Sequence, residues 1–205
     1  MEFSDVVRRR RMVRNYNTDR PVPKELIDKL LEYAIRAPSA GFSQGWGFLV
    51  LTEAADRAAF WQATTDENEE SDSWLRGLMS APVLIIAHSN KGIYLDRYAQ
   101  ADKGWTDRDE AHWPVPYWDI DTGFASMMMM LGAVDSGLVS CFFGIPAEHI
   151  DDYRAAFDVP ADYMPIGVLS VGYRAPDVMS PSLRRGRRQV SEVAHWGRWG
   201  QDATI

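Results

Sequence analysis

The chain has 205 residues, of which 46% are hydrophobic and 25% are charged, a balance typical of a globular protein with one sizeable core. Its 22 Lys and Arg residues against 29 Asp and Glu residues give a net charge of -7, which argues against general nucleic-acid binding. The single cysteine, Cys141, excludes an intramolecular disulfide. No apolar signal segment opens the chain, so we expect a cytoplasmic protein. The longest apolar tract, residues 123–143, is interrupted by glycines and an aspartate, so we expect no membrane span.

The first expected element is a short helix capped by Ser4 and Asp5, with an arginine cluster at its end. Five arginines fall within residues 8–14 although the chain is acidic, and residues 184–188 hold four more. A guanidinium group donates paired hydrogen bonds to phosphate, so the two clusters predict a phosphate site to which both contribute. The alternative is a solvated basic face, the usual fate of a charge run.

Apolar spacing and helix-breaking residues predict the remaining regular elements. Residues 39–46 form a loop of small residues, and the acidic residues 66–72 form a solvated link between two helices. In chain order we expect helices over 23–35, 54–64, 73–80, 122–136 and 146–157, and strands over 48–51, 82–87, 139–143 and 166–171.

Residues 88–120 follow neither the helical nor the strand period, and a long irregular segment in a compact domain is usually functional. Aromatic side chains are frequent in this segment, which predicts a wall or lid over a flat organic substrate; the alternative is that they only cover the core. The aromatic residues are Tyr94, Tyr98, Trp105, Trp113, Tyr117 and Trp118.

The helix over 122–136 is apolar on all sides, with methionine at each of residues 127–130. In a chain of this size, the additional apolar side predicts a subunit interface. The basic tail from Pro176 ends with Trp196 and Trp199, which would pack on a partner subunit. We therefore expect one domain over 1–205, with a lid over 88–120, a dimer arm over 176–205 and a homodimeric state.

Several chemical motifs are absent from the sequence. We find no dinucleotide-binding glycine motif, no phosphate-binding loop of the Walker type, no serine nucleophile elbow and no spacing of the four histidines that suits a metal. An enzyme with this sequence would depend on a cofactor for its chemistry. The arginine clusters require a phosphate and the aromatic segment suits a flat ring, and flavin mononucleotide (FMN) meets both demands.

Three stretches, residues 10–16, 21–22 and 37–48, resemble the nitroreductase family of flavoenzymes, whose pattern is R-R-S-x-R-x-F, then P-V, then A-P-S-x-x-N-x-Q-P-W-x-F. The resemblance resumes at residues 137–144 and 185–193. It implies an α+β fold with a central, mainly antiparallel sheet wrapped by helices, in an intertwined homodimer with FMN at the interface. It also implies electron transfer from NAD(P)H to nitroaromatic, quinone or related conjugated acceptors by a ping-pong mechanism, in which the flavin carries the chemistry and no side chain is catalytic.

The resemblance also implies roles for individual residues. Basic residues of both clusters would hold the phosphate and ribityl chain, the small loop would face the flavin from the partner subunit, and main-chain N–H groups after the third strand would contact flavin N5 and O4. The cofactor-binding residues expected on this basis are Arg10, Arg11, Met12, Arg14, Pro38, Ser39, Ala40, Gly41, Gln44, Phe143, Gly144, Arg185 and Arg187.

Three positions depart from the family pattern: Met12 replaces Ser, Phe42 replaces Asn and Gly45 replaces Pro. Residues 39–42 look more like the flavin destructase branch, which fragments reduced FMN, and residues 13–16 look like the cyclic dipeptide oxidase branch. The alternatives to a reductase are therefore a biosynthetic flavoenzyme, either destructase or dehydrogenase, and a flavin-binding protein without turnover.

Overall fold

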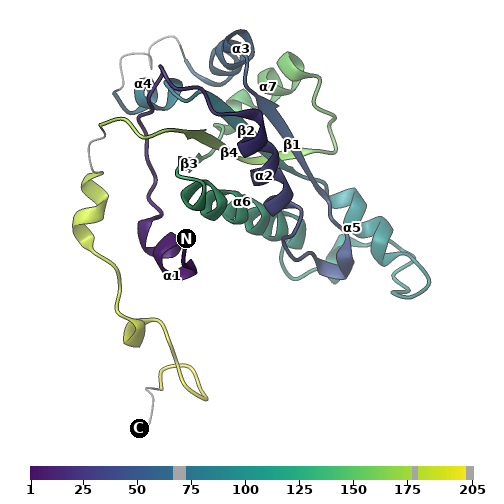
Figure 1. The fold of residues 1–205 in the computed structure, drawn as a ribbon. Coiled ribbons are helices and arrows are strands. Elements are labelled where there is room, and N and C mark those ends of the chain that lie inside the picture. Colours follow the sequence, from purple (N-terminus) through teal and green to yellow (C-terminus); the bar gives the residue numbers. More distant parts are fainter. Residues whose placement is uncertain (67–72, 177–179, 202–205) are drawn as a thin grey trace.

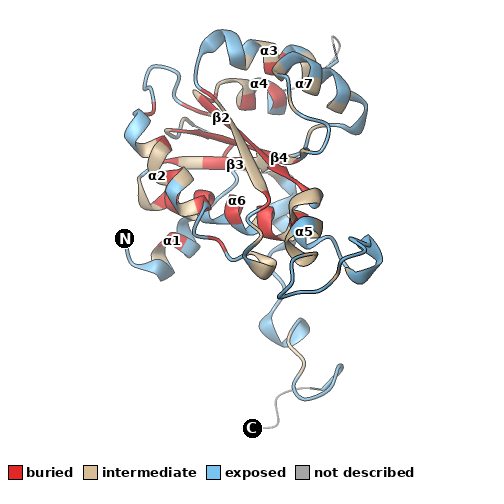
Figure 2. Ribbon diagram, turned by 90° about the vertical axis from the view of Figure 1, so that its right-hand side faces the viewer, coloured by how far each residue is buried: buried red, intermediate tan, exposed pale blue. Residues whose placement is uncertain are grey.

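The computed structural model describes residues 1–66, 73–176 and 180–201. Among these residues, four strands form one antiparallel sheet in the order β1-β2-β4-β3: β1 (Trp46–Leu51), β2 (Val83–Ser89), β4 (Met164–Gly172) and β3 (Val139–Phe143). The strand β2 is buried along its whole length, as the continuous apolar run predicts (Figure 2). The predicted α+β class with a mainly antiparallel sheet is confirmed.

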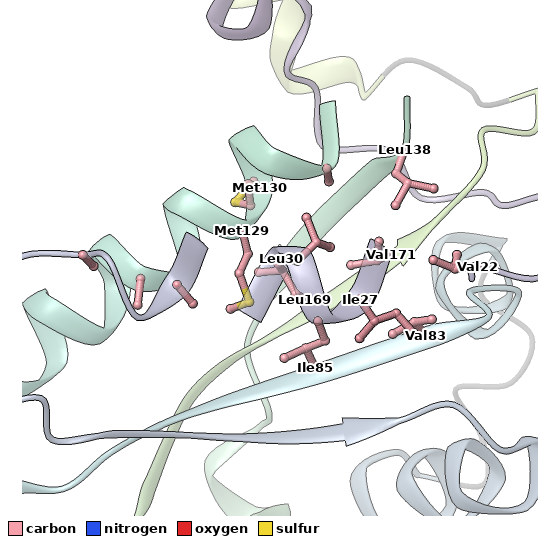
Figure 3. Close-up of a cluster of buried hydrophobic side chains, with 14 residues drawn as sticks. Val22, Ile27, Leu30, Val83, Ile85, Met129, Met130, Leu138, Leu169 and Val171 are labelled. Atoms are coloured by element: carbon pink, nitrogen blue, oxygen red, sulfur yellow. The ribbon is translucent and has the colours of Figure 1, made fainter. Parts of the chain in front are cut away.

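Helices cover both faces of the sheet (Figure 1). On one face, α2 (Lys24–Ala34) and α6 (Tyr117–Asp135) enclose a core that includes Ile85 and Leu169 (Figure 3). On the other face lie α3 (Ala54–Thr64), α4 (Ser73–Met79) and α7 (Ile150–Phe157), packed on Leu84 and Ile86. Successive residues of β2 therefore serve opposite cores, because side chains alternate along a strand.

The helix α2 packs closely against α6, and glycine makes this approach possible. A Cβ atom added at Gly132 of α6 would lie 2.4 Å from the Tyr33 ring of α2. The apolar stripe of α2 buries Ile27 and Leu30 on this contact. The predicted amphipathic helix is confirmed, although it ends at Ala34 and its proline, Pro23, is the N-cap residue.

The prediction that residues 88–120 are irregular is partly wrong. The strand β2 continues to Ser89, residues 91–98 form α5 (Lys91–Tyr98), and α6 begins at Tyr117. The side chain of Asn90 caps α5 by accepting from the Ile93 N–H. Periodicity does not reveal α5 because Tyr94 is its one buried residue, and the buried polar residues of the first turns of α6 interrupt the apolar pattern there.

The two chain ends also have defined courses. The first helix, α1 (Phe3–Arg9), has Glu2 as its N-cap residue rather than Ser4 or Asp5, and it packs on α6. After β4 the chain runs beside Asn15, whose Nδ2 donates to Pro176 O at 2.6 Å. From residue 180 the tail extends away from the body (Figure 1), with two short 3₁₀ helices, Pro181–Arg185 and Val190–Glu192.

Candidate functional site

The N-terminal arginine stretch runs along the edge of β3. Met12 forms a parallel bridge with Ser140, the Val13 N–H donates to Ser140 O at 3.0 Å, and the Phe142 N–H faces Met12 Sδ at 3.5 Å. Met12 bridges the second residue of β3, so the arginine stretch runs alongside this strand, which ends at Phe143 and is followed by the exposed Gly144. We call residues 8–14, with Phe143 and Gly144, the arginine end.

The arginines of this stretch differ in what they contact. Arg8 pairs with Asp5, and Arg11 Nη1 donates to the carbonyls of Arg8 and Arg10 at 2.5 and 2.9 Å, which closes the end of α1. Arg14 Nη1 donates to Met12 O at 3.3 Å. Within the part of the chain that the structure describes, the buried Nη1 of Arg10 has no hydrogen-bond partner. A buried, unsatisfied guanidinium nitrogen fits a site that receives an anion.

A further basic residue, Arg76, belongs to the neighbouring helix α4. A Cβ atom added at Gly77 would lie 2.0 Å from Arg14 O, so only glycine allows α4 this close to the arginine stretch. Arg76 precedes Gly77 and is exposed. Sequence analysis missed this residue because a lone arginine on a short helix gives no signal until the packing of α4 on Arg14 is known.

Phe143 and Gly144 also line a cavity of about 120 Å³ beneath α3 and α4. The Phe143 ring stacks on Trp61 with a centroid distance of 5.7 Å and meets Trp74 edge-on at 6.4 Å. Sequence analysis singled out neither tryptophan, since both lie at ordinary helical positions. The aromatic contacts fix the side chain of Phe143 and leave the main chain of Gly144 accessible.

The loop of small residues forms the second part of the predicted site. Gly41, Phe42 and Gln44 have φ angles of +60°, +56° and +53°, so three of four consecutive residues are in the left-handed region. The Gln44 N–H donates to Ser39 Oγ at 2.9 Å, and Ser43 Oγ donates to Ala40 O at 2.6 Å. We call residues 38–45, with the side chains that hold them, the loop end.

A buried carboxylate holds this loop. Asp121 of α6 is 3% exposed, and its Oδ2 accepts from the Ala40 N–H at 2.7 Å and from the Tyr94 hydroxyl at 2.8 Å. Burial and the hydrogen bond to Asp121 raise the pKa of Tyr94 far above its usual range, so its hydroxyl remains a donor. Asp121 was not predicted, because it precedes the helix predicted over 122–136 and resembles a surface acid in the sequence.

The helix α5 holds the loop from a second side. Arg97 Nε donates to Gly41 O at 2.9 Å, and a Cβ atom added at Gly41 would lie 2.6 Å from the Tyr98 ring. The Asn90 N–H, just before α5, donates to Gly45 O at 2.7 Å. Glycine is therefore required at residue 41 both for its positive φ and for the close approach of Tyr98.

The six aromatic residues predicted as a substrate wall pack on one another. Tyr98 lies 4.5 Å from Trp113 and 4.8 Å from Trp105 between ring centroids. Trp113 is central, because it also contacts the rings of Tyr94, Tyr117 and Trp118 at 5.7–6.1 Å. Through Tyr98, this cluster forms a firm support beside the loop end.

The two parts of the predicted site do not meet within one chain. The arginine stretch descends to α1 on one side of the molecule, and the loop lies beside α5 on the other (Figures 1 and 2). Pro38 and Gln44 are exposed at the loop end. Arg185 and Arg187 are exposed on the tail, which leads away from the body.

Other kinds of site lack support in the described ranges. No group of three or more His, Cys, Asp or Glu residues among residues 1–66, 73–176 and 180–201 could hold a metal ion. In the same ranges, every helix is too short or too polar to cross a membrane.

Comparison with known proteins gives consistent matches over most of the chain. The family model described as "Nitroreductase family" matches residues 7–173. The Bacillus subtilis (strain 168) protein named "Putative NAD(P)H nitroreductase YodC" is 24% identical over 215 residues, which cover 94% of this chain and 97% of YodC. A nitroreductase family protein from Clostridium difficile 630 is 26% identical with a TM-score of 0.72, covering 97% of this chain and 99% of its own. A structure from Exiguobacterium sibiricum 255-15, solved in complex with FMN, has a TM-score of 0.66 at 23% identity. The match covers 92% of this chain and 98% of the other chain.

Proposed function

The chain belongs to the nitroreductase family, and on this basis we propose that it is an FMN-dependent oxidoreductase. It transfers electrons from NAD(P)H to nitroaromatic, quinone or related conjugated acceptors. Support comes from the match over residues 7–173, from the NAD(P)H nitroreductase name of YodC and from the FMN complex of a protein with the same fold. The observation that carries the proposal is the buried Arg10 Nη1, which lacks a partner in the described chain at the arginine end.

Each part of the arginine end has a task in this proposal. Arg10 and Arg14 bind the phosphate, while Phe143 and Gly144 present main-chain N–H groups to the flavin ring. Bound FMN supplies two-electron redox chemistry that no side chain of the chain can provide. The chain itself binds and orients the reactants, and donor and acceptor occupy one site in turn, which gives ping-pong kinetics.

We further propose that the protein is a homodimer in which the loop end of one subunit completes the arginine end of the other. The separation of the two ends within one chain supports this arrangement. An apolar surface supports it too, since Phe124, Met127 and Met128 are exposed on α6, and Phe3 and Val7 on α1, which packs on α6. An apolar surface of this kind marks an interaction site. A compact monomer carrying bound FMN in sedimentation velocity would contradict the dimer.

The segment over 88–120 acts as a wall of the substrate site in this proposal. Tyr98 of its aromatic cluster lies against Gly41, and Arg97 of the same segment donates to the Gly41 carbonyl. In the dimer, the wall and the loop would together cover a small aromatic or conjugated substrate and exclude water. Trp196 and Trp199 are exposed on the tail from residue 180, which would pack on the partner subunit. This packing would bring Arg185 and Arg187 to the surface of the partner.

The first experiment identifies the cofactor and the reaction together. The purified protein should be yellow and release FMN, not FAD, when chromatographed after denaturation. Anaerobic stopped-flow mixing with NADH or NADPH should bleach the flavin, and a quinone or nitroarene should restore its colour. A colourless protein that takes up no FMN would refute the proposal.

The same preparation separates the reductase from a flavin destructase. The enzyme is incubated in air with excess NAD(P)H, and total flavin is followed by chromatography. We expect unchanged flavin with steady nicotinamide oxidation once an acceptor is added. Stoichiometric loss of flavin with a benzimidazole product would show destructase chemistry instead.

A further inference from the structure

The loop end contains a large aromatic side chain in an unfavourable conformation. Phe42 has φ +56° and is 74% exposed. The left-handed region suits glycine and tolerates asparagine or aspartate, whereas a bulky residue there is an outlier. The exposed ring gains little burial within its own chain that could offset this strain.

The surrounding contacts prevent the loop from relaxing. Ala40 is held by Asp121, and the Gly41 carbonyl is held by Arg97. On the other side of Phe42, the Gln44 N–H is held by Ser39 Oγ. The conformation of Phe42 is therefore imposed from both sides, and its ring projects from a fixed base into solvent. Strained residues that are held in this way cluster at ligand sites, where the strain is part of the function.

We propose that Phe42 is a specificity-determining residue whose ring forms an aromatic wall of the acceptor site. The ring selects flat conjugated acceptors over saturated ones that carry the same polar group. The inference rests on the proposed function, in which residues 39–41 face the flavin of the partner subunit, because Phe42 then lies next to the acceptor. Aromatic pairs gain free energy beyond their buried area, and a saturated ring lacks this gain.

The test compares nitrobenzene with nitrocyclohexane, which share the nitro group and differ in ring planarity. Dissociation constants are measured from changes in the visible flavin spectrum of the oxidised holoprotein, without NAD(P)H. We expect the wild type to favour nitrobenzene, and Phe42→Leu to reduce that preference by roughly 2- to 12-fold, the range of one aromatic pair. The matched control, Phe42→Tyr, keeps the ring and should keep the preference.

A second measurement tests the strain. Phe42→Gly should raise the melting temperature of the FMN-free protein by about 2–4 °C, because glycine adopts a positive φ freely. A fall in melting temperature, together with dissociation of the dimer, would overturn the inference by showing that the ring is a structural contact.

The outcomes also separate this inference from the proposed function. A wild type that binds no FMN overturns both. A wild type that binds FMN and reduces nitroarenes, but whose preference for nitrobenzene survives Phe42→Leu, overturns the role of Phe42 alone. Loss of the preference for nitrobenzene in Phe42→Leu, with FMN affinity unchanged, supports the role of Phe42.

Discussion

The loop end and the arginine end are built on opposite principles. At the loop end the chain satisfies its own polar groups: Asp121 accepts two hydrogen bonds, and the carbonyls of Gly41 and Gly45 each receive a donor. At the arginine end a buried guanidinium nitrogen of Arg10 has no partner in the described chain. Protein contacts thus fix the loop before any ligand binds, whereas the arginine end keeps a donor for the phosphate that we propose it binds.

Buried polar residues at the end of β2, next to the loop, also form their hydrogen bonds within the chain. His88, Ser89 and Asn90 are all buried at the end of β2. Ser89 Oγ donates to Asp119 at 2.5 Å, and Asn90 Nδ2 donates to Asp162 at 2.8 Å. Substitutions that remove the hydrogen bonds holding the loop should therefore lower stability, and substitutions of the arginines should weaken binding.

The largest expected effect is the loss of stability in Asp121→Ala. The substitution leaves the Ala40 N–H and the Tyr94 hydroxyl without their acceptor, and two hydrogen bonds to a charged group contribute roughly 3–6 kcal/mol together. The free energy of unfolding is measured by urea denaturation. For Asp121→Asn, which keeps an acceptor oxygen, the decrease in the free energy of unfolding should be less than half as large. Equal losses in the two variants would show that the carboxylate does not hold the loop.

The next effect is on FMN affinity at the arginine end. Arg10→Ala and Arg14→Ala should each weaken FMN binding by about 1.5–3 kcal/mol, the contribution of a charge-assisted hydrogen bond. Riboflavin, which lacks the phosphate, should bind almost unchanged. Arg8→Ala is the control, because Arg8 already pairs with Asp5. Equal losses for FMN and riboflavin in titration calorimetry would rule out a phosphate role.

A third variant, Arg10→Met, should stabilise the protein, in contrast to Asp121→Ala. Arg10→Met removes the unsatisfied buried nitrogen and keeps an apolar side chain, so the FMN-free protein should gain about 1 kcal/mol in the free energy of unfolding. The measurement is urea denaturation of the protein stripped of FMN. A loss of stability in this variant would mean that the Arg10 guanidinium is already satisfied, and the contrast between the two ends would fail.

The last expected effect concerns acid sensitivity at the end of β2, beside α7. Burial lowers the pKa of His88 below its ordinary value of 6.5, and Nε2 lies 2.8 Å from the Tyr153 hydroxyl. Above pH 6.5 both the folded and the unfolded chain hold a neutral imidazole. Below it the unfolded chain takes up a proton first, so stability falls by at most about 1.4 kcal/mol per pH unit from this group.

The control for this prediction is His88→Gln, which retains hydrogen-bonding capacity without titrating. The difference between the unfolding free energies of the two proteins should be constant above pH 7 and should change between pH 6.5 and 5, with the wild type losing more. Parallel curves across this interval would exclude His88 as the source of acid sensitivity.

Much of the fold could be predicted from sequence pattern. The bounds of α3 and β3 agree with the predicted ranges, because their apolar spacing and flanking turn residues are unambiguous. The helix α5 escaped prediction since Tyr94 is its one fully buried residue, so no apolar stripe marks it, and its start depends on a side-chain cap from Asn90. Packing and capping decided the structure where periodicity was weak.

The candidate site was only partly predictable, for a similar reason. The sequence shows five arginines in one run but does not distinguish their roles. Arg11 hydrogen-bonds the end of α1, whereas Arg10 Nη1 has no partner in the described chain. A phenylalanine at residue 42 carries no signal of a positive φ. Asp121 reads as a surface acid until α6 is packed against the loop. Each of these roles depends on contacts between segments distant in sequence.

The bridge between Met12 and Ser140 has a consequence beyond ligand binding. In the strand order β1-β2-β4-β3, β3 lies at a margin of the sheet, and the Val13 N–H occupies the Ser140 carbonyl there. An uncovered edge strand offers its main-chain groups to other chains and promotes aggregation. The arginine stretch covers part of this edge, and its repeated positive charge repels the same edge of another chain. Truncation of the N-terminal residues would therefore turn a soluble preparation into one prone to edge-to-edge aggregation.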